Sequence, residues 1–150
     1  MIFSQGTTFG AYRILAPLGS GGMGEVYRAR DTRLGRDVAL KVLREKDSQD
    51  PGLLNRFDQE ARAASSLNHP NIVVVYETGS AGVAGHAEPI HYLAMELIEG
   101  EPLSALLARE SLPIGRVLDI ASQLTDGLAR AHESGIVHRD LKPSNIFLDA

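Results

Sequence analysis

The chain has 150 residues, of which 43% are hydrophobic, and a formal net charge of -4 from 15 Lys and Arg against 19 Asp and Glu. This size and apolar content are typical of a globular protein, and the acidic balance argues against long nucleic acids, which normally bind to a clustered basic face. The absence of cysteine excludes disulfides and thiolate metal sites. The start, MIFSQGTTFG, lacks the parts of a secretion signal, and no apolar run could cross a membrane. We therefore expect a cytoplasmic protein.

A glycine-rich turn joins the first predicted strands. Tyr12–Leu18 and Glu25–Arg30 alternate loosely between polar and apolar residues, and between them Gly19, Gly21 and Gly24 form the pattern GxGxxG. A dinucleotide-binding fold needs a helix directly after the last glycine, and a P-loop needs GK followed by Ser or Thr; neither is present. The pattern fits either a plain hairpin turn or a flap whose backbone N–H groups approach phosphate oxygens closely.

A lysine and a glutamate in the next elements each need a partner. Lys41 lies between apolar neighbours on the predicted strand Asp37–Leu43, where a lysine is often only a surface residue. Asp50 and Pro51 form a typical helix start, and Glu60 lies on or next to the inward apolar stripe of that helix. Because an inward charge is costly unless it is paired, Lys41 and Glu60 are expected to pair with each other.

Two further strands are predicted on either side of a long loop. Ile72–Thr78 and Ile90–Leu97 are rich in β-branched residues. The segment between them is rich in Gly and Ala and long for a hairpin loop, so we expect it to be mobile. His86 and His91 have no cysteine and no third histidine nearby, which argues against a metal site.

The second half of the chain is predicted to be mainly helical. A short helix covers Pro102–Arg109, and a longer one, capped by Ser111, begins at Pro113 and ends at Gly135. Gly127 in the middle of the long helix costs about 1 kcal/mol relative to Ala. Close packing against a neighbour is a plausible reason for its presence.

The stretch His138–Asn145, HRDLKPSN, crowds functional groups into a short segment before a predicted strand, Ile146–Leu148. It holds a carboxylate at Asp140, an ammonium at Lys142 and a carboxamide at Asn145. These groups can accept a proton, neutralise a phosphate and hold a metal. A solvated surface loop is the other interpretation of such a segment when it is taken alone.

All of these segments together resemble the protein kinases, most closely the bacterial Hanks-type Ser/Thr kinases, from about Tyr12 to the last residue. The resemblance is carried by LGSGGMGEVYRARD, VALKVL, RFDQEARAASSLNHPNIV, YLAMELIEG and GIVHRDLKPSNIFL. It implies an α+β fold with a five-stranded antiparallel N-lobe and one αC helix, followed by the first helices and the catalytic loop of an incomplete α-helical C-lobe. The implied domains are an N-terminal extension at 1–11, the N-lobe with its hinge at 12–98 and the C-lobe portion at 99–150.

The resemblance also implies roles for individual residues, with ATP and Mg²⁺ as cofactors. Lys41 would bind the α- and β-phosphates and pair with Glu60 when the helix swings inward. Asp140 would accept the proton of the substrate hydroxyl, Lys142 would steady the γ-phosphate, and Asn145 would ligate Mg²⁺. His138 and Arg139 would be scaffold residues. The residues implied to form the nucleotide site are Leu18, Gly19, Ser20, Gly21, Gly22, Met23, Gly24, Val26, Ala39, Lys41, Glu60, Met95, Glu96 and Ile98.

The sequence departs from the family pattern in one respect. The family supplies its main Mg²⁺ ligand from a DFG motif that follows the catalytic loop, and this chain ends at Ala150 without one. The leading expectation is a Ser/Thr protein kinase with a protein hydroxyl as phosphate acceptor, compatible with a dimer through the N-lobe and with a membrane anchor downstream in a longer protein. The alternatives are a non-catalytic module that binds a nucleotide or a partner, and a fragment without an independent role. Because the apolar stripe of the long helix lacks the helices that cover it in the family, we expect the 150-residue chain alone to be partly molten or to aggregate.

Overall fold

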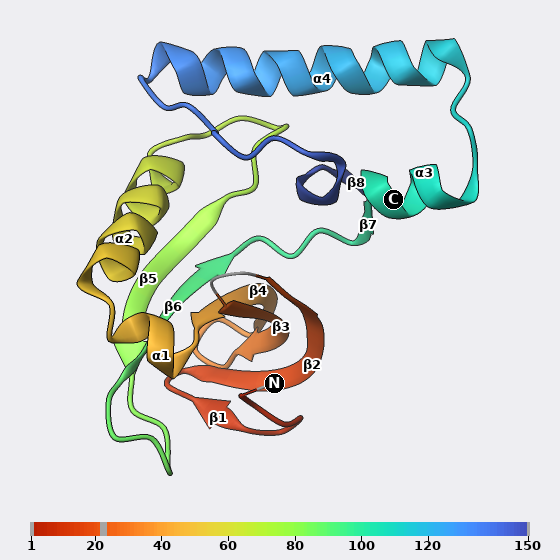
Figure 1. Ribbon diagram of the computed structural model, residues 1–150. Coiled ribbons are helices and arrows are strands. Elements are labelled where there is room, and N and C mark those ends of the chain that lie inside the picture. Colours follow the sequence, from red (N-terminus) through yellow and green to blue (C-terminus); the bar gives the residue numbers. More distant parts are fainter. Residues whose placement is uncertain (1, 22–23, 150) are drawn as a thin grey trace. The chain divides into compact units, whose positions relative to one another are not determined.

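The structure is a computed structural model that describes residues 2–21 and 24–149 (Figure 1). The chain forms two compact units: the N-terminal unit comprises Met1–Ser66 and Val74–Leu97, and the C-terminal unit comprises Leu67–Val73 and Ile98–Ala150. The sequence assigned Leu67–Val73 to the N-lobe. This segment groups with the C-terminal unit, where the Asn71 side chain donates to Gln123 Oε1 at 3.2 Å. The domain limits 1–11, 12–98 and 99–150 stay predictions.

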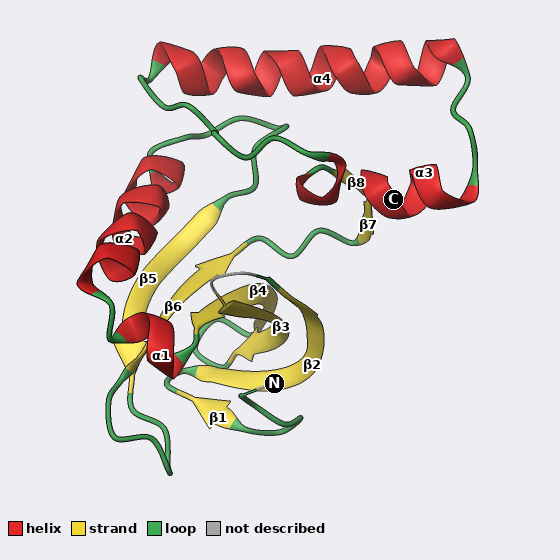
Figure 2. Cartoon of the chain, viewed as in Figure 1, coloured by secondary structure: helices red, strands yellow, loops and turns green. Residues whose placement is uncertain are grey.

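An antiparallel sheet dominates the N-terminal unit (Figure 2). It has six strands in the order β1-β2-β3-β4-β6-β5. The strands of the expected five-stranded sheet are all present, and the two-residue strand β1 extends it at one edge. Their bounds are β1 Thr8–Phe9, β2 Tyr12–Ser20, β3 Gly24–Asp31, β4 Arg36–Leu43, β5 Val75–Ala81 and β6 Ile90–Met95. The predicted strand Ile72–Thr78 was therefore placed too early in the chain, since β5 begins only at Val75.

The core of this unit lies on one face of the sheet, as the alternation along β4 requires. Val38, Leu40 and Val42 are all fully buried there. Residues ahead of the predicted first strand also contribute, because Phe3 and Phe9 belong to the same buried cluster. The stretch expected as an N-terminal extension is thus packed into the core of the N-terminal unit.

The turn between β3 and β4 is closed by backbone N–H groups that donate hydrogen bonds to the side chain and the backbone carbonyl of Asp31. The backbone N–H groups of Arg33 and Leu34 donate to Asp31 Oδ1 at 2.9 and 3.2 Å. Gly35 has a φ of 67°, a left-handed conformation that favours glycine. These bonds hold the chain reversal between the two strands.

The helices of the N-terminal unit are α1, Glu45–Ser48, and α2, Pro51–Ser65. The Asp50 side chain accepts hydrogen bonds from the N–H groups of Gly52 and Leu53 at 2.8 and 3.3 Å, so the predicted helix start is confirmed. Helix α2 packs beside β5 (Figure 1). The short helix α1 was not predicted.

The C-terminal unit contains two helices, α3, Leu103–Arg109, and α4, Ile114–Glu133, together with a single turn of 3₁₀-helix, η1, Pro143–Asn145. The strands β7, Gly100–Pro102, and β8, Phe147–Asp149, pair antiparallel. Ser111 does not cap α4 as expected; the N-cap position is Pro113, which makes no side-chain bond. A proline at that position fixes the entry of the chain but offers no acceptor for the first N–H groups.

Gly127 of α4 lies against the backbone of another segment of the same unit. It is buried, and a Cβ added there would approach the Asn71 carbonyl oxygen to 3.3 Å. The close packing expected at Gly127 is confirmed.

Candidate functional site

Residues expected to contact a nucleotide share one face of the sheet in the N-terminal unit. The β3–β4 register sets Val26 directly opposite Lys41, and the β4–β6 register sets Ala39 opposite Met95. Directly opposed residues of antiparallel strands point to the same side. This face lies opposite to Val38, Leu40 and Val42, and Val26, Lys41 and Met95 remain partly exposed on it, whereas Ala39 is buried.

The glycine-rich segment is a hairpin that joins β2 to β3. Gly19 pairs with Val26 and Ser20 with Glu25, and the Gly21 N–H donates to the Gly24 carbonyl oxygen at 2.9 Å. Leu18, just before the hairpin, is half exposed. The remaining loop residues of the predicted set, Gly22 and Met23, lie outside the described residues.

Gly24 is required by packing within the sheet. A Cβ at this position would run into the Val42 carbonyl oxygen on β4. Because a strand follows Gly24 directly, the dinucleotide-binding interpretation of the glycine pattern is excluded.

The structure does not form the expected ion pair between Lys41 and Glu60. Glu60 is exposed on α2, and neither side chain makes an ion pair with any residue in the described part of the chain. The buried residues of α2 are Phe57 and Ala61, which define a narrow stripe. At ~100° per residue, Glu60 lies roughly 80° from the centre of that stripe. Glu60 is therefore exposed beside the buried stripe and not paired inward in this conformation.

Glu96, which directly follows β6, is hydrogen-bonded to Val74, the residue before β5. The Glu96 N–H donates to the Val74 carbonyl oxygen at 2.8 Å, and the Glu96 carboxylate accepts from the Val74 N–H at 3.1 Å. The Glu96 N–H is therefore occupied, which leaves its carbonyl oxygen as the backbone group that can bind a ligand. Ile98, the other residue expected to bind adenine through its backbone, belongs to the C-terminal unit and is half-buried.

The stretch around Asp140 brings the functional groups predicted there into contact. Lys142 Nζ lies 3.1 Å from Asp140 Oδ2, and the Asn145 side-chain amide donates to the same oxygen at 3.2 Å. The amide also donates to the Asp140 backbone carbonyl at 2.9 Å, and the Asp140 N–H donates to His138 Nδ1 at 3.2 Å. Arg139 has a positive φ of 64°, an uncommon conformation for a non-glycine residue that turns the chain between His138 and Asp140.

The electrostatics of this cluster favour an ionised Asp140. Its side chain is 65% exposed, and the hydrogen bond from Lys142 is the main cause that holds the pKa of the Asp140 carboxyl below its usual value. The amide of Asn145 and the charge of His138 act in the same direction. An exposed, ionised carboxylate beside an ammonium can accept a proton from a bound hydroxyl.

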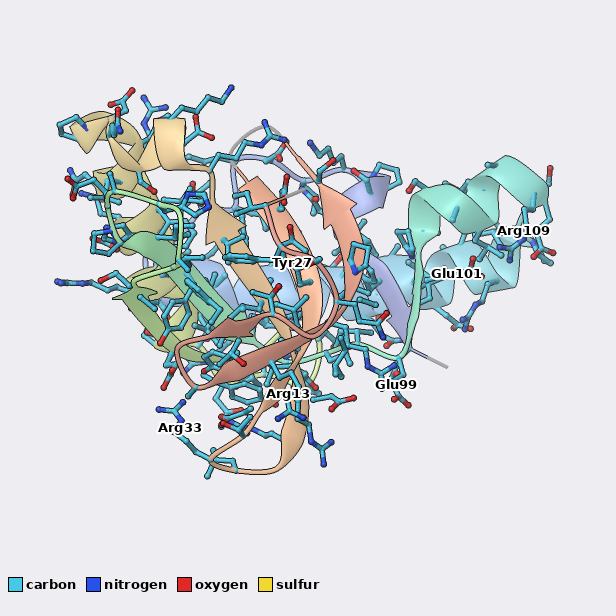
Figure 3. All side chains as sticks on the ribbon, turned by 90° about the horizontal axis from the view of Figure 1, so that it is seen from below. Arg13, Tyr27, Arg33, Glu99, Glu101 and Arg109 are labelled. Carbon is cyan, nitrogen blue, oxygen red and sulfur yellow. The ribbon has the colours of Figure 1, made fainter. Side chains whose placement is uncertain are left out.

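The downstream end of this stretch is fastened to the start of α3. The Asn145 N–H donates to the Lys142 carbonyl at 2.9 Å, which closes η1, and the Leu103 N–H donates to the Ile146 carbonyl at 2.7 Å. Glu101 and Arg109, labelled in Figure 3, form a double hydrogen bond of 2.5 and 2.8 Å between β7 and α3. Sequence reasoning missed this anchor, because a strand of three residues such as β7 shows no periodicity.

The metal ligand expected from the sequence is the side-chain amide of Asn145. Among residues 2–21 and 24–149, no group of three or more His, Cys, Asp or Glu side chains converges. The two hydrogen bonds donated by the Asn145 amide nitrogen orient its oxygen away from Asp140, so that oxygen is the atom suited to a cation. Within the same described residues, no helix is long and apolar enough to span a membrane.

Comparisons with known proteins agree with this architecture. The model of the protein kinase domain matches residues 12–150. Serine/threonine-protein kinase pkn2 of Myxococcus xanthus is 46% identical over 139 residues, which cover 93% of this chain and 16% of that protein. Serine/threonine-protein kinase PknA of Mycobacterium tuberculosis is 44% identical over 143 residues, which cover 95% of this chain and 33% of that protein. The chain thus spans only 16% to 33% of the length of these curated relatives.

Solved structures show the same fold. A crystal structure of the Mycobacterium tuberculosis PknI kinase domain superposes with a TM-score of 0.82 at 32% identity, covering 98% of this chain and 57% of that one. A second structure of that domain gives a TM-score of 0.81 and covers 99% of this chain and 60% of that one. The likeness extends through the sheet and the helices. The chain belongs to the protein kinase family.

Proposed function

We propose that the chain carries the nucleotide-binding residues and the catalytic loop of a serine/threonine protein kinase, which transfers the γ-phosphate of ATP to a Ser or Thr hydroxyl of a protein. The observation that supports this most strongly is the contact of Lys142 and Asn145 with one oxygen of Asp140. A solvated loop has no reason to gather these groups around one carboxylate. Lys142 at two positions past Asp140, followed by Pro143, resembles the Ser/Thr subgroup of the family.

The N-terminal unit would bind the nucleotide through the shared face of its sheet. Leu18, Val26, Ala39 and Met95 offer apolar contacts for adenine, and the carbonyl oxygen of Glu96 offers a hydrogen-bond acceptor. The backbone of Ile98, which belongs to the C-terminal unit, stays a prediction as the second hydrogen-bond partner of adenine. The hairpin Gly19–Gly24 would cover the phosphates, and the Lys41 ammonium would neutralise part of their charge. An inward movement of α2 that brings Glu60 to Lys41 belongs to this proposal.

The C-terminal unit would act on the acceptor. Asp140 accepts the proton of the substrate hydroxyl while the oxygen of that hydroxyl forms a bond to the γ-phosphorus. The bond from the γ-phosphorus to the bridging oxygen breaks, and ADP leaves with that electron pair. Lys142 offsets the charge on the transferred phosphoryl group.

Mg²⁺ is the cofactor that the family implies, and this chain fits it only in part. Asn145 would supply one neutral oxygen, while Mg²⁺ in proteins normally takes one or two carboxylates in addition to phosphate oxygens and water. When bound, the ion neutralises phosphate charge. The carboxylate ligands of the ion are not assigned in this proposal.

Phosphate transfer from γ-labelled ATP to casein, catalysed by the intact protein that contains this chain, tests the proposal. Lys41→Met and Asp140→Asn should each lower the rate by about 100-fold or more, because each removes a charge that acts in the transition state. Lys46→Met and Asp126→Asn, at exposed positions of α1 and α4, are matched controls that should keep the wild-type rate. A folded protein that binds ATP without transfer supports a non-catalytic nucleotide-binding module instead.

Cytoplasmic location of this portion and a dimer through the strands of the N-terminal unit also stay predictions. Analytical ultracentrifugation of the intact protein, with and without ATP, measures whether it forms a dimer.

A further inference from the structure

The residues ahead of β2 form a strap whose first residues lie beside the start of β3, next to the glycine-rich hairpin. We define the N-terminal strap as Ile2–Phe9. The Gly6 N–H donates to the Ile14 carbonyl at 2.8 Å, and the Ile14 N–H donates to the Thr7 carbonyl at 2.9 Å, so the strap follows β2 on its way into β1. It therefore has a fixed path along the sheet.

The first residues of the strap bind two side chains of β3. The Ile2 N–H donates to Glu25 Oε2 at 2.6 Å, and the Phe3 N–H donates to the Tyr27 hydroxyl at 3.0 Å. The Tyr27 hydroxyl in turn donates to the same Glu25 oxygen. The Phe3 ring lies 5.6 Å from the Tyr27 ring and 5.0 Å from the Phe9 ring. One compact cluster thus joins the strap to the beginning of β3.

Glu25 is an unusual residue to find in this cluster. It is only 5% exposed, and burying a carboxylate is costly unless hydrogen bonds compensate. Although burial by itself raises the pKa of Glu25, the bonds from Tyr27 and from the Ile2 N–H outweigh it and hold that pKa below its usual value. The strap is therefore part of what keeps this carboxylate ionised and buried.

The position of Glu25 in the chain connects this cluster to the glycine-rich hairpin. Glu25 directly follows Gly24, the last glycine of the hairpin, and pairs with Ser20 on the other arm. Because successive side chains of a strand point to opposite faces, Glu25 and Tyr27 face the core while Val26 between them faces the nucleotide side with Lys41. The cluster fixes the strand from behind the face that is proposed to bind ATP.

We infer that the N-terminal strap and the residues Glu25 and Tyr27 are a positioning device for the glycine-rich hairpin, so that docking of the strap sets the affinity for the phosphates of ATP. The inference rests on the proposed function, since it assigns the hairpin to the nucleotide phosphates. Glu25 and Tyr27 touch no nucleotide in this scheme; they act through the backbone of Gly24 and Val26.

The affinities for ATP and for adenosine distinguish this role from a general effect on folding. Adenosine lacks phosphates, so it makes none of the contacts proposed for the backbone of Gly19–Gly24 and depends on the hairpin only through the flanking apolar contacts of Leu18 and Val26, whereas partial unfolding of the unit weakens both ligands alike. The Kd of ATP and the Kd of adenosine should each be measured by calorimetry on the intact protein. The variants are Tyr27→Phe, which removes only the hydroxyl that bonds Glu25 and Phe3, and Glu25→Gln.

Each variant should raise the Kd for ATP by about 5- to 30-fold, the effect of one or two lost hydrogen bonds, while the Kd for adenosine changes less than about 2-fold. Tyr76→Phe is the matched control, because its hydroxyl makes no hydrogen bond among the described residues and its ring instead lies under Arg36. A Phe3→Ala variant should reproduce the effect from the strap side.

The outcomes separate the inference from the proposed function. If wild type binds ATP and Lys41→Met weakens that binding, but Tyr27→Phe and Glu25→Gln leave the ratio of the two Kd values unchanged, the positioning role is wrong while the nucleotide site stands. If the wild-type protein binds no ATP, or Lys41→Met binds it as tightly, both fail. A selective loss of ATP affinity in Tyr27→Phe and not in Tyr76→Phe supports the inference.

Discussion

At the scale of single residues, the state of Asp140 depends mainly on Lys142. The ammonium lies 3.1 Å from the carboxylate and is the main cause of the lowered pKa of Asp140. Lys142→Met should therefore raise this pKa toward the usual value of about 3.9. A ¹³C NMR titration of the Asp140 carboxyl measures the change, with Lys46→Met as control.

The sign of this shift determines its effect on activity. In the wild type, the lowered pKa keeps Asp140 ionised at every pH above that pKa. In Lys142→Met the pKa rises only toward its usual value, which is still far below 7, so the variant also has an ionised base near pH 7. The loss of the Lys142 charge should lower the rate at every pH, and in addition the acidic limb of the pH–rate profile should move to higher pH. A titration of Asp140 that is identical in Lys142→Met and wild type would show that the ammonium does not control the carboxylate.

Two glycines of α4 give a matched test of packing. Gly127 lies against the Asn71 backbone, whereas a Cβ at Gly115 meets nothing within 4 Å. Gly127→Val should lower the free energy of unfolding by about 1–3 kcal/mol, because the side chain forces the segments apart. Gly115→Ala should raise it by up to about 1 kcal/mol through helix propensity. Urea denaturation of both variants measures the difference, and equal stabilities would contradict the packing role of Gly127.

At the scale of elements, the sequence predicted best what local chemistry decides. The start of α2 followed from the Asp50 cap and Pro51, both of which act within a single turn. The face of Lys41 followed from the two-residue period of β4. The short elements β1, α1 and β7 were missed, because they exist only through their contacts with other segments and carry no periodic pattern.

The pairing of Lys41 with Glu60 could not be predicted from local sequence patterns. Both residues lie on the elements expected for them, but the pair depends on the rotation and distance of α2 relative to the sheet. Those are tertiary quantities that no spacing in the sequence contains. The contacts around Asp140 were predictable for the opposite reason, since Asp140, Lys142 and Asn145 lie within a single short segment.

A polar network also ties several strands together at the sheet edge. Glu77 of β5 accepts hydrogen bonds from Tyr12 at 2.7 Å, from Tyr92 at 2.9 Å and from Arg33 at 3.0 Å. Burial by itself raises the pKa of Glu77, but these three donors outweigh it and the pKa is lowered. The network therefore stabilises the sheet only while Glu77 is ionised.

The pH dependence of stability tests this network. Because the pKa of Glu77 is lower in the folded chain, its contribution is complete above the unfolded value of about 4.3 and is lost as the pH falls through the folded value. Glu77→Gln should cost about 1.5–3 kcal/mol at pH 7 and progressively less below pH ~4. Thermal unfolding across this range, with the exposed Glu88→Gln as reference, measures the effect. A cost independent of pH would rule out the ionised network.

At the scale of the whole molecule, the exposed apolar surface of the C-terminal unit determines how the chain behaves in solution. Ile114 and Leu118 of α4 are 74% and 62% exposed. The same unit has an apolar groove of about 240 Å³ between α3 and α4, which is lined by Leu103, Leu107, Leu112, Val117, Ile120, Ala121 and Leu124. The apolar stripe predicted on this helix is thus present and partly uncovered.

This surface should make the 150-residue chain associate with itself when it is produced alone. Each large apolar side chain that becomes buried in such contacts contributes about 1.5–3 kcal/mol, so a few of them suffice at micromolar concentration. Leu118→Glu should shift the chain toward monomer in analytical ultracentrifugation. Leu34→Glu is the matched control, because Leu34 is 66% exposed but lies in the turn between β3 and β4. If both variants dissociate the chain equally, general apolar exposure drives association; if wild type is already a monomer with a sharp thermal transition, the α4 surface has no such effect.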